Sequence, residues 1–281
     1  MKQSKNSIRN KRILIAGFSG SIGEELTRQL CKNNKVFGID LDETRSFDLV
    51  QDLQDFWVKY RVGDIRNKDT VGDVFSDFKP QIVINAAAYK HVSPMEHYPR
   101  EAVETNILGN LNLLEESIKW ECLEKYIFIS TDKVVNASSI MGATKKVSEI
   151  IVKNQGGIVV RFGNVLGSRG SVIPIWQRQA DKGEPLIITD SRMERFFMTI
   201  EEACGLVVEA IKIGQGGEII ILDMKQPINI KNLAEAIIER SGRDLGLKEI
   251  GIRPGEQLKE ELMTTEERQR AIKQGKFWVI K

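Results

Sequence analysis

The stretch that decides the fold is Arg12-Ile13-Leu14-Ile15-Ala16-Gly17-Phe18-Ser19-Gly20-Ser21-Ile22-Gly23. Its first half is an apolar run typical of a buried strand, and its second half is a turn with glycines at three-residue spacing. Residues 21–32 follow, and their apolar side chains at four-residue spacing predict a helix. A strand, a glycine turn and a helix in this order predict the first unit of an open α/β sheet.

The same alternation continues toward the C-terminus. Apolar, β-branched runs predict further strands at residues 35–40, 58–62, 81–86, 125–130, 157–162 and 218–222. Amphipathic patterns predict helices at residues 100–120, 143–153, 200–213 and 230–241. Apolar strands that alternate with helices favour a parallel sheet covered on both faces. We therefore predict an α/β protein with a Rossmann-type, doubly wound parallel sheet and a smaller C-terminal substrate lobe.

The regular alternation weakens after Gly163, and most of the prolines lie in residues 164–198 and 224–281. These irregular segments predict a second structural part. We expect residues 1–163 with about 199–223 to form the dinucleotide-binding domain. Residues of about 164–198 with 224–281 are expected to form the smaller lobe.

The glycine turn predicts a dinucleotide site, because one glycine permits the tight turn, one lets a pyrophosphate approach and one lets helix and strand pack closely. Asp40 ends the second strand, where its carboxylate can accept hydrogen bonds from an adenosine ribose. That carboxylate favours NAD over NADP, although Arg45 lies near enough in sequence to serve a 2′-phosphate. The predicted cofactor-binding residues are Gly17, Ser19, Gly20, Ser21, Ile22, Gly23, Asp40, Asp64, Ile65, Ala86, Ala87, Ala88, Asn106 and Lys145.

Composition argues against several other classes of protein. Lys+Arg 41 against Asp+Glu 39 leave a net charge of +2, which gives no reason to expect a nucleic-acid partner. No apolar run reaches the roughly 18 residues that span a bilayer, and no signal-peptide pattern opens the chain. Cys31, Cys122 and Cys204 lack metal-ligand spacing, and the two histidines are isolated. We expect a cytoplasmic protein without a membrane span or a bound metal.

Polar side chains gather where the predicted strand 125–130 ends. Thr131, Asp132 and Lys133 bring a hydroxyl, a carboxylate and an amine to a carboxyl edge of the sheet, where open α/β proteins bind ligands. Lys145 follows within Met141-Gly142-Ala143-Thr144-Lys145. A Thr-Asp-Lys triplet alone is as typical of a helix cap as of a catalytic site, so this prediction depends on the neighbouring glycine motif.

Six longer motifs carry a resemblance to a known family. They are NAAAYKHV (85–92), ISTDKVVN (129–136), MGATKK (141–146), RFGNVLGSRGSVIP (161–174), RFFMTIEEA (195–203) and GIRPGEQLKEEL (251–262). In this order the chain resembles the UDP-N-acetylglucosamine 4,6-dehydratases of polysaccharide biosynthesis, the CapD-like branch of the extended short-chain dehydrogenases/reductases. The resemblance runs from about Arg12 to Leu262.

The resemblance implies an internal redox cycle with a tightly bound, recycled NAD. The sugar of UDP-N-acetylglucosamine is oxidised at C4, water is lost across C5–C6, and the hydride returns to C6. The product is a UDP-4-keto-6-deoxy-N-acetylhexosamine. The resemblance implies that Lys133 is the base at C5 and Asp132 the acid at the C6 hydroxyl. It also implies that Thr131 hydrogen-bonds the C4 oxygen and that Lys145 holds the nicotinamide ribose.

The same resemblance implies which residues bind the nucleotide sugar. Arg253 would hold the diphosphate and Glu256 a ribose hydroxyl, and arginine suits the planar, bidentate contact with phosphate. Asn164 lies in the region that closes on the nucleotide diphosphate. Lys90 is expected to reach the sugar or the diphosphate.

Met141 departs from the general pattern of short-chain dehydrogenases, which place the tyrosine of Tyr-x-x-x-Lys at this position. Methionine cannot exchange a proton. A subgroup of the resembled family also carries methionine there, so we keep Met141 in the predicted catalytic set. The proton of the C4 hydroxyl would then leave through Thr131, Asp132 or a water to Lys145.

Two other functions stay open at this point. The first is a nucleotide-sugar epimerase or ketoreductase on the same fold, because one fold supports many reactions. The second is a non-catalytic NAD-binding sensor or assembly subunit, which only Met141 favours. The helices near 100–120 and 143–153 commonly form a dimer contact in the resembled superfamily, so we expect a homodimer or a larger homo-oligomer.

Overall fold

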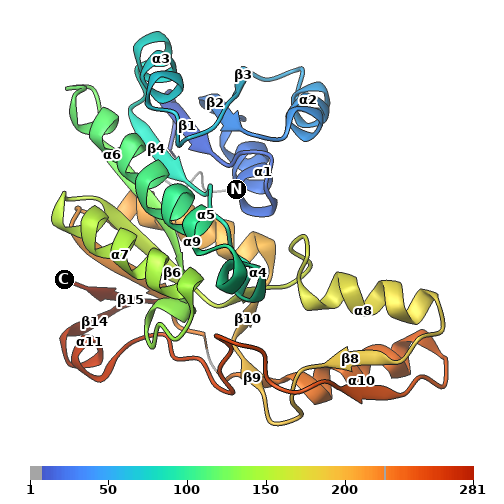
Figure 1. Cartoon of the computed structure of the whole chain (residues 1–281). Helices are drawn as coiled ribbons and strands as arrows, with labels where there is room; N and C mark the ends of the chain where they lie inside the picture. The colour runs from blue at the N-terminus through green and yellow to red at the C-terminus, as the bar shows by residue number, and fades with distance from the viewer. Residues whose placement is uncertain (1–7, 225) are drawn as a thin grey trace.

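The computed structural model describes residues 8–224 and 226–281, so the first seven residues assigned to the dinucleotide-binding domain lie outside the description. A large nine-stranded sheet organises the molecule (Figure 1). In spatial order its strands are β14 (Ala271–Gln274), β15 (Phe277–Ile280), β11 (Glu218–Leu222), β6 (Ile158–Phe162), β5 (Lys125–Thr131), β4 (Ile82–Asn85), β1 (Arg12–Ala16), β2 (Lys35–Asp40) and β3 (Val58–Val62).

The strands from β11 to β3 pair in parallel, which confirms the predicted fold class. The chain runs from β1 outward to β3 and then crosses back to place β4 on the other side of β1. The carboxyl ends of β1 and β4 therefore flank a topological switch point, where open sheets bind ligands. The glycine turn leaves β1 at this point.

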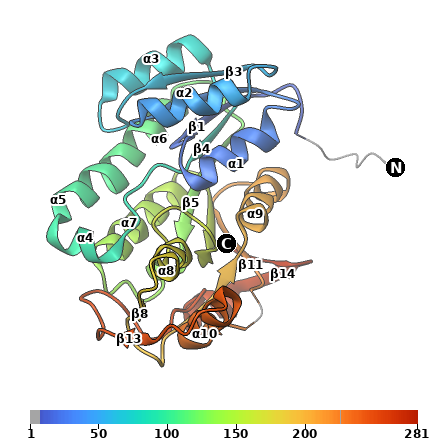
Figure 2. The same cartoon turned by 90° about the vertical axis from the view of Figure 1, so that its right-hand side faces the viewer.

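Helices cover both faces of the sheet (Figure 2). They are α1 (Ser21–Leu30), α2 (Glu43–Asp52), α3 (Lys68–Phe78), α4 (Val92–His97), α5 (Pro99–Ala102), the π-helical η1 (Val103–Gly109), α6 (Asn110–Ile118), the 3-10 turn η2 (Asp132–Val134), α7 (Ile140–Asn154), α8 (Val172–Asp181), α9 (Ile200–Ile213), α10 (Ile230–Ser241) and α11 (Thr265–Arg270).

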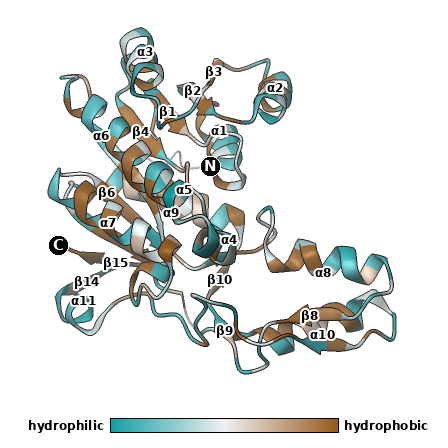
Figure 3. Ribbon diagram, viewed as in Figure 1, coloured by the Kyte–Doolittle hydropathy of each residue, from teal (hydrophilic) through white to brown (hydrophobic). Residues whose placement is uncertain are grey.

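The apolar run of β1 serves two hydrophobic cores, because successive side chains of a strand point to opposite faces. Ile13 and Ile15 join the core beneath α1 and α9, whereas Leu14 and Ala16 join the core beneath α3 and α6. All four side chains are fully buried. Complete burial of an aliphatic side chain contributes about 1.5–3 kcal/mol, so both cores hold β1 in place. The hydropathy colouring shows the same apolar strands between helices with polar outer faces (Figure 3).

A smaller lobe extends from one end of the sheet, at the lower right of Figure 1. Its core lies between α8, α10 and β8 (Leu186–Ile188) and is centred on the fully buried Trp176. β13 (Leu247–Glu249) pairs with β8, and β12 (Ile228–Asn229) pairs with β9 (Glu194–Arg195). β7 (Asn164–Val165) pairs with β10 (Phe197–Met198) where the lobe meets the sheet.

Three sequence predictions differ from the structure. Residues 271–280 were expected in the smaller lobe, but β15 pairs antiparallel with β11 and β14 pairs with β15, so this segment extends the large sheet. The predicted helix 100–120 consists of α5, η1 and α6, which follow one another directly. The helix predicted from residue 143 begins at Ile140, because the Ser139 hydroxyl accepts the Gly142 N–H at 3.0 Å and caps it earlier.

Among residues 8–224 and 226–281, no helix is both long enough and apolar enough to cross a membrane.

Candidate active site

The glycine turn after β1 is built for close backbone approach. Gly17 has φ +75°, and a Cβ at this position would lie 2.7 Å from the Ala87 nitrogen. A Cβ on Gly23 would lie 2.1 Å from the Gly17 carbonyl oxygen. Neither position accepts a larger residue without moving backbone, so the turn keeps α1, β1 and the end of β4 in contact.

Helix α1 begins at this turn without a side-chain cap, unlike α2, α3 and α7. The N–H groups of its first turn therefore point toward whatever lies in front of the glycine motif, and the helix dipole favours an anion there. The predicted adenosine contact, Asp40, ends β2 beside the turn. Its Oδ2 accepts the Ser19 N–H at 3.0 Å and its Oδ1 accepts the Asp42 N–H at 3.1 Å, so the carboxylate fixes the turn.

A cavity of about 620 Å³ lies in front of the glycine motif and reaches the end of β5. This volume lies within the usual range of small-molecule sites. The predicted site residues that line it are Gly17, Gly20, Ser21, Ile22, Gly23, Ala86, Ala88, Lys90, Thr131, Lys133, Met141, Lys145, Asn164 and Glu256. The structure thus brings residues from four strand ends, α7 and the segment after β13 to one space.

The remaining predicted residues are absent from the lining of this cavity, namely Ser19, Asp40, Asp64, Ile65, Ala87, Asn106, Asp132 and Arg253. Asp64 accepts hydrogen bonds from the Arg66 side chain at 2.7 Å and from its N–H at 2.9 Å. The buried Ile65 packs where Gly109 leaves room, since a Cβ there would lie 2.7 Å from it. The Asn106 amide exchanges two hydrogen bonds with the backbone of Tyr89. Asn106 therefore shapes the wall without facing the cavity.

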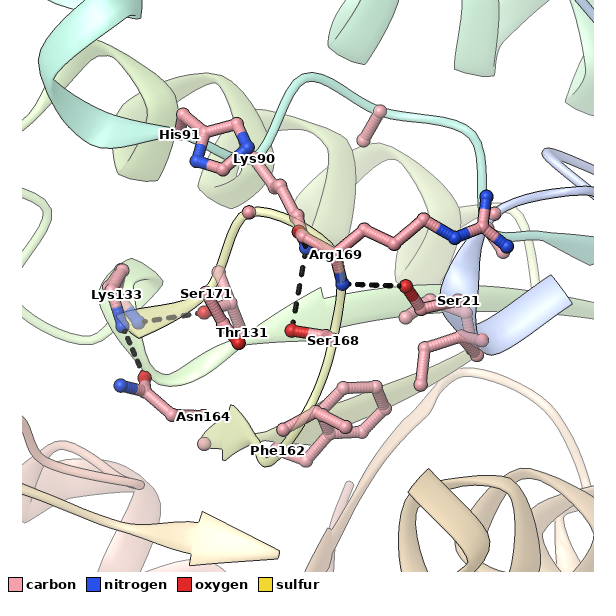
Figure 4. A pocket seen from close by; sticks show the side chains of 18 of the residues that line it. Ser21, Lys90, His91, Thr131, Lys133, Phe162, Asn164, Ser168, Arg169 and Ser171 are labelled. Atoms are coloured by element: carbon pink, nitrogen blue, oxygen red, sulfur yellow. Dashed lines mark hydrogen bonds between the residues drawn. The ribbon is translucent and has the colours of Figure 1, made fainter. Parts of the chain in front are cut away.

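Lys133 is the amine that faces the cavity at the end of β5 (Figure 4). Its Nζ donates to Asp132 Oδ1 at 2.9 Å and to Asn164 Oδ1 at 3.0 Å. The Asp132 side chain is fully buried behind it, and Oδ1 also accepts the Thr131 hydroxyl at 3.0 Å. Asp132 Oδ2 has no hydrogen-bond partner in the part of the chain that the structure describes. The strand end therefore presents an amine and a hydroxyl to the cavity, with a carboxylate behind both.

Lys145 reaches the same cavity from α7, one turn after Met141. Its Nζ donates to the Ile129 carbonyl at 2.5 Å and lies 4.1 Å from the centre of the Phe128 ring. Burial lowers the pKa of Lys145 to about 7, an effect that Glu149 partly opposes. Met141 is buried against Met95 and Ala102 while lining the cavity, so it fills space in the cavity wall.

A loop after β7 crosses the glycine motif, and we call residues Gly167–Ser171 the strap (Figure 4). The Arg169 guanidinium donates to the Ser19 carbonyl at 2.7 Å and pairs with Glu24 on α1. The Arg169 N–H donates to the Ser21 hydroxyl at 3.0 Å, and Lys90 Nζ donates to the Arg169 carbonyl at 2.8 Å. The strap therefore joins the smaller lobe to the predicted dinucleotide site. Burial, with the nearby Arg169 charge, lowers the pKa of Lys90.

The two predicted residues of the segment after β13 differ in position. Glu256 lines the cavity and accepts the Arg253 N–H at 3.2 Å. Arg253 is exposed, and its side chain does not line the cavity.

Several residues of the site carry no signal in a single sequence. Arg169 and Ser171 line the cavity because the strap folds back across 148 residues of chain onto α1. Glu260 approaches Lys133 Nζ to 3.9 Å from the far end of the chain. The motifs GSRGSV and EQLKEEL contain these residues, but only the fold shows which of their side chains turn inward.

The sequence of the chain is similar to known proteins over most of its length. Residues 13–281 match the family model described as polysaccharide biosynthesis protein. The chain is 42% identical over 275 residues to the capsular polysaccharide biosynthesis protein CapD of Staphylococcus aureus, covering 92% of this chain and 46% of that protein. It is 35% identical over 270 residues to a UDP-N-acetylglucosamine 4,6-dehydratase (inverting) of Campylobacter jejuni, covering 92% and 78%. The chain thus spans about half the length of the Staphylococcus relative.

A second group of relatives carries another activity in its name. The UDP-glucose 4-epimerase of Rickettsia prowazekii is 33% identical over 287 residues, covering 96% of this chain and 83% of that protein. Among solved structures, Pen from Bacillus thuringiensis superposes with a TM-score of 0.92 at 34% identity, covering 97% and 88%. The chain belongs to the polysaccharide biosynthesis protein family of Rossmann-type enzymes, whose members include dehydratases and epimerases of nucleotide sugars.

Proposed function

We propose that this chain is an NAD-dependent nucleotide-sugar 4,6-dehydratase that acts on UDP-N-acetylglucosamine. The observation that carries the proposal is the position of Lys133: its amine and the Thr131 hydroxyl face the same cavity as the glycine motif. A base and a hydroxyl donor are therefore available within one space to a hexose placed against a dinucleotide. This proximity supplies the orientation that such chemistry requires.

The residues present fit a dinucleotide. The uncapped start of α1 offers N–H groups to a pyrophosphate, and Gly17 and Gly23 leave no side chain in its path. When bound, NAD accepts a hydride from a sugar carbon and returns it. The Asp40 carboxylate at the end of β2 favours NAD over a 2′-phosphorylated cofactor. Arg45, which lines the cavity and pairs with Asp42 at 3.3 Å, keeps NADP as the second choice.

Lys133 would take the C5 proton, and Thr131 would hydrogen-bond the C4 oxygen. Asn164 and Asp132 hold the Lys133 amine from two sides, which fixes the direction of its lone pair once the amine is neutral. Lys145 would hold the nicotinamide ribose, and its lowered pKa of about 7 lets it exchange protons near neutrality. This matters because Met141 cannot accept a proton, so the proton of the C4 hydroxyl must go to another group.

We propose Asp132 as the acid that protonates the departing C6 hydroxyl. Its buried Oδ2 lacks a protein partner among the described residues, which is the kind of atom a substrate hydroxyl or a water would satisfy. On the nucleotide side, Lys90, Asn164 and Glu256 line the cavity and would contact the UDP-sugar. Arg253 would join them only if its exposed guanidinium turned inward.

Incubation with UDP-N-acetylglucosamine and no added NAD tests the proposal. We expect a product lighter than the substrate by one water, measured by mass spectrometry. Lys133→Ala should abolish it, whereas Met141→Ala should keep turnover. A product of unchanged mass would support an epimerase, the alternative that the Rickettsia relatives favour. Dependence on stoichiometric NAD(P)H would support a ketoreductase, and no turnover with any sugar nucleotide would support the non-catalytic alternative.

Two further expectations accompany this proposal. We propose a cytoplasmic location, where UDP-sugars are available to an enzyme of this kind. We also propose a homodimer through α5–α6 and α7, because Val103, Leu108, Ile118, Val147 and Ile150 expose apolar side chains on these helices.

A further inference from the structure

Behind Lys133 lies a second carboxylate that the proposed reaction has not used. Glu260 follows the Arg253–Glu256 segment, and 6% of its side chain is exposed. Its Oε1 lies 3.9 Å from Lys133 Nζ and 3.8 Å from the Arg195 guanidinium. Burial raises the pKa of Glu260, an effect that Lys133 and Arg195 oppose.

Arg195 holds this arrangement in place. Its buried guanidinium donates to the carbonyls of Glu194, Gln257 and Leu258 at 2.7, 2.6 and 3.1 Å. These bonds tie β9 to the backbone just before Glu260. All three of these bonds go to neutral carbonyl oxygens. Among the described residues, Glu260 is the one carboxylate within 4 Å of the Arg195 guanidinium.

The charged groups around the Lys133 amine come from three parts of the chain. Asp132 lies on η2, Arg195 on β9, and Glu260 with Glu256 on the segment after β13. Asn164 on β7 adds a neutral oxygen. Three carboxylates therefore surround two cations here, and removing the Glu260 charge makes the surroundings of the amine less negative.

We propose that Glu260 is a positioning residue for Lys133, whose carboxylate sets the charge balance around the amine and thereby the pH range in which the amine serves as a base. This inference rests on the proposed function, in which Lys133 takes the C5 proton. Glu260 is absent from the lining of the cavity in front of the glycine motif and instead lines a second cavity of about 310 Å³, with Asp223, Arg268 and Trp278. Glu260 therefore acts from behind Lys133 and does not touch the sugar.

The test compares Glu260→Gln with Glu261→Gln, because Glu261 is the adjacent carboxylate and is exposed. The first measurement is the pH dependence of kcat/KM for the purified enzyme. Loss of the Glu260 charge favours the neutral amine, so the rising limb of the profile should move to lower pH. An opposite charge within about 4–6 Å shifts a pKa by about 1–3 units, so we expect the rising limb to move by about one pH unit.

The second measurement does not depend on dehydratase activity. Acetic anhydride reacts with neutral amines, and peptide mass spectrometry gives the extent of Lys133 acetylation at each pH. In Glu260→Gln half-maximal acetylation should also occur at lower pH, and Glu261→Gln should match the unchanged protein. Glu260→Asp keeps the charge and should restore the original pH range. If the Gln variant fails to fold, Glu260→Ala in the same acetylation assay replaces it.

The outcomes separate the two proposals. An acetylation profile of Lys133 that is the same with and without the Glu260 charge would overturn this inference, whatever the activity. A displaced acetylation profile in a protein that forms no dehydrated product would support this inference and refute the proposed function. A loss of activity without displacement of either profile would show that Glu260 is merely structural.

Discussion

Replacing Lys145 by methionine should stabilise the protein at neutral pH, because the amine is held in an apolar setting. The Lys145 Nζ contacts the Phe128 ring and one carbonyl, and burial lowers its pKa from 10.5 to about 7. One pH unit corresponds to about 1.4 kcal/mol, so the depression costs the folded state about 5 kcal/mol at pH 7 and below. Methionine removes this cost but leaves the Ile129 carbonyl without its donor, which costs about 1–3 kcal/mol. A net gain of about 2–4 kcal/mol follows from this difference.

The pH dependence identifies the cause. Between pH 7 and 10.5 the unfolded chain keeps the Lys145 proton and the folded chain does not, so the unchanged protein gains stability as pH rises. The advantage of Lys145→Met should therefore shrink by about 1.4 kcal/mol for each pH unit above 7. Urea unfolding of the cofactor-free protein at pH 7, 8 and 9 measures it. Lys153→Met, at the half-buried end of the same helix, is the control and should show no such trend.

Two results would refute this reasoning. One is a Lys145→Met protein that is less stable than the unchanged protein at pH 7. The other is a stability difference that stays constant from pH 7 to pH 9, because this would show that the amine keeps its proton in the folded state. Either result would also remove the argument that Lys145 exchanges protons near neutrality during the proposed reaction.

Three other substitutions test the site and the assembly. Gly23→Ala places a Cβ 2.1 Å from the Gly17 carbonyl, so the purified protein should lose its bound dinucleotide, measured by chromatography of the released cofactor, and retention would contradict the proposed cradle. Arg169→Ala removes the link from the strap to Ser19 and Glu24, and it should speed NAD release about tenfold, equivalent to about 1.4 kcal/mol, in a fluorescence assay. Arg178→Ala is its control, because Arg178 is exposed on α8. Equal release rates in the two variants would show that the strap does not slow NAD release. Leu108→Asp should convert a dimer to monomers in light scattering, whereas an unchanged mass would exclude this helix face from the interface.

Much of the fold could be predicted because its signals are local. The boundaries of β2, β3 and β11 match the predicted strands, and α9 and α10 match the predicted helices. Each of these elements carries its own periodicity, and helix α9 also carries a capping box formed by Thr199 and Glu202 at its start. The glycine motif could be predicted equally well. Gly23 is required by contacts within the same strand–turn–helix unit, and Gly17 is required by contact with Ala87 at the end of β4.

The sequence by itself determined the α/β class, the dinucleotide turn and the cluster of polar side chains at the end of β5, because each depends on residues close together in the chain. Only the tertiary structure decided that β14 and β15 extend the large sheet, that Asp132 lies behind Lys133, and that Arg253 faces solvent. It also decided that Arg169 and Glu260 meet the site. These outcomes depend on packing between residues far apart in the chain. They also depend on whether a charged side chain finds a partner when it turns inward from a loop, and neither factor leaves a periodic signal in the sequence.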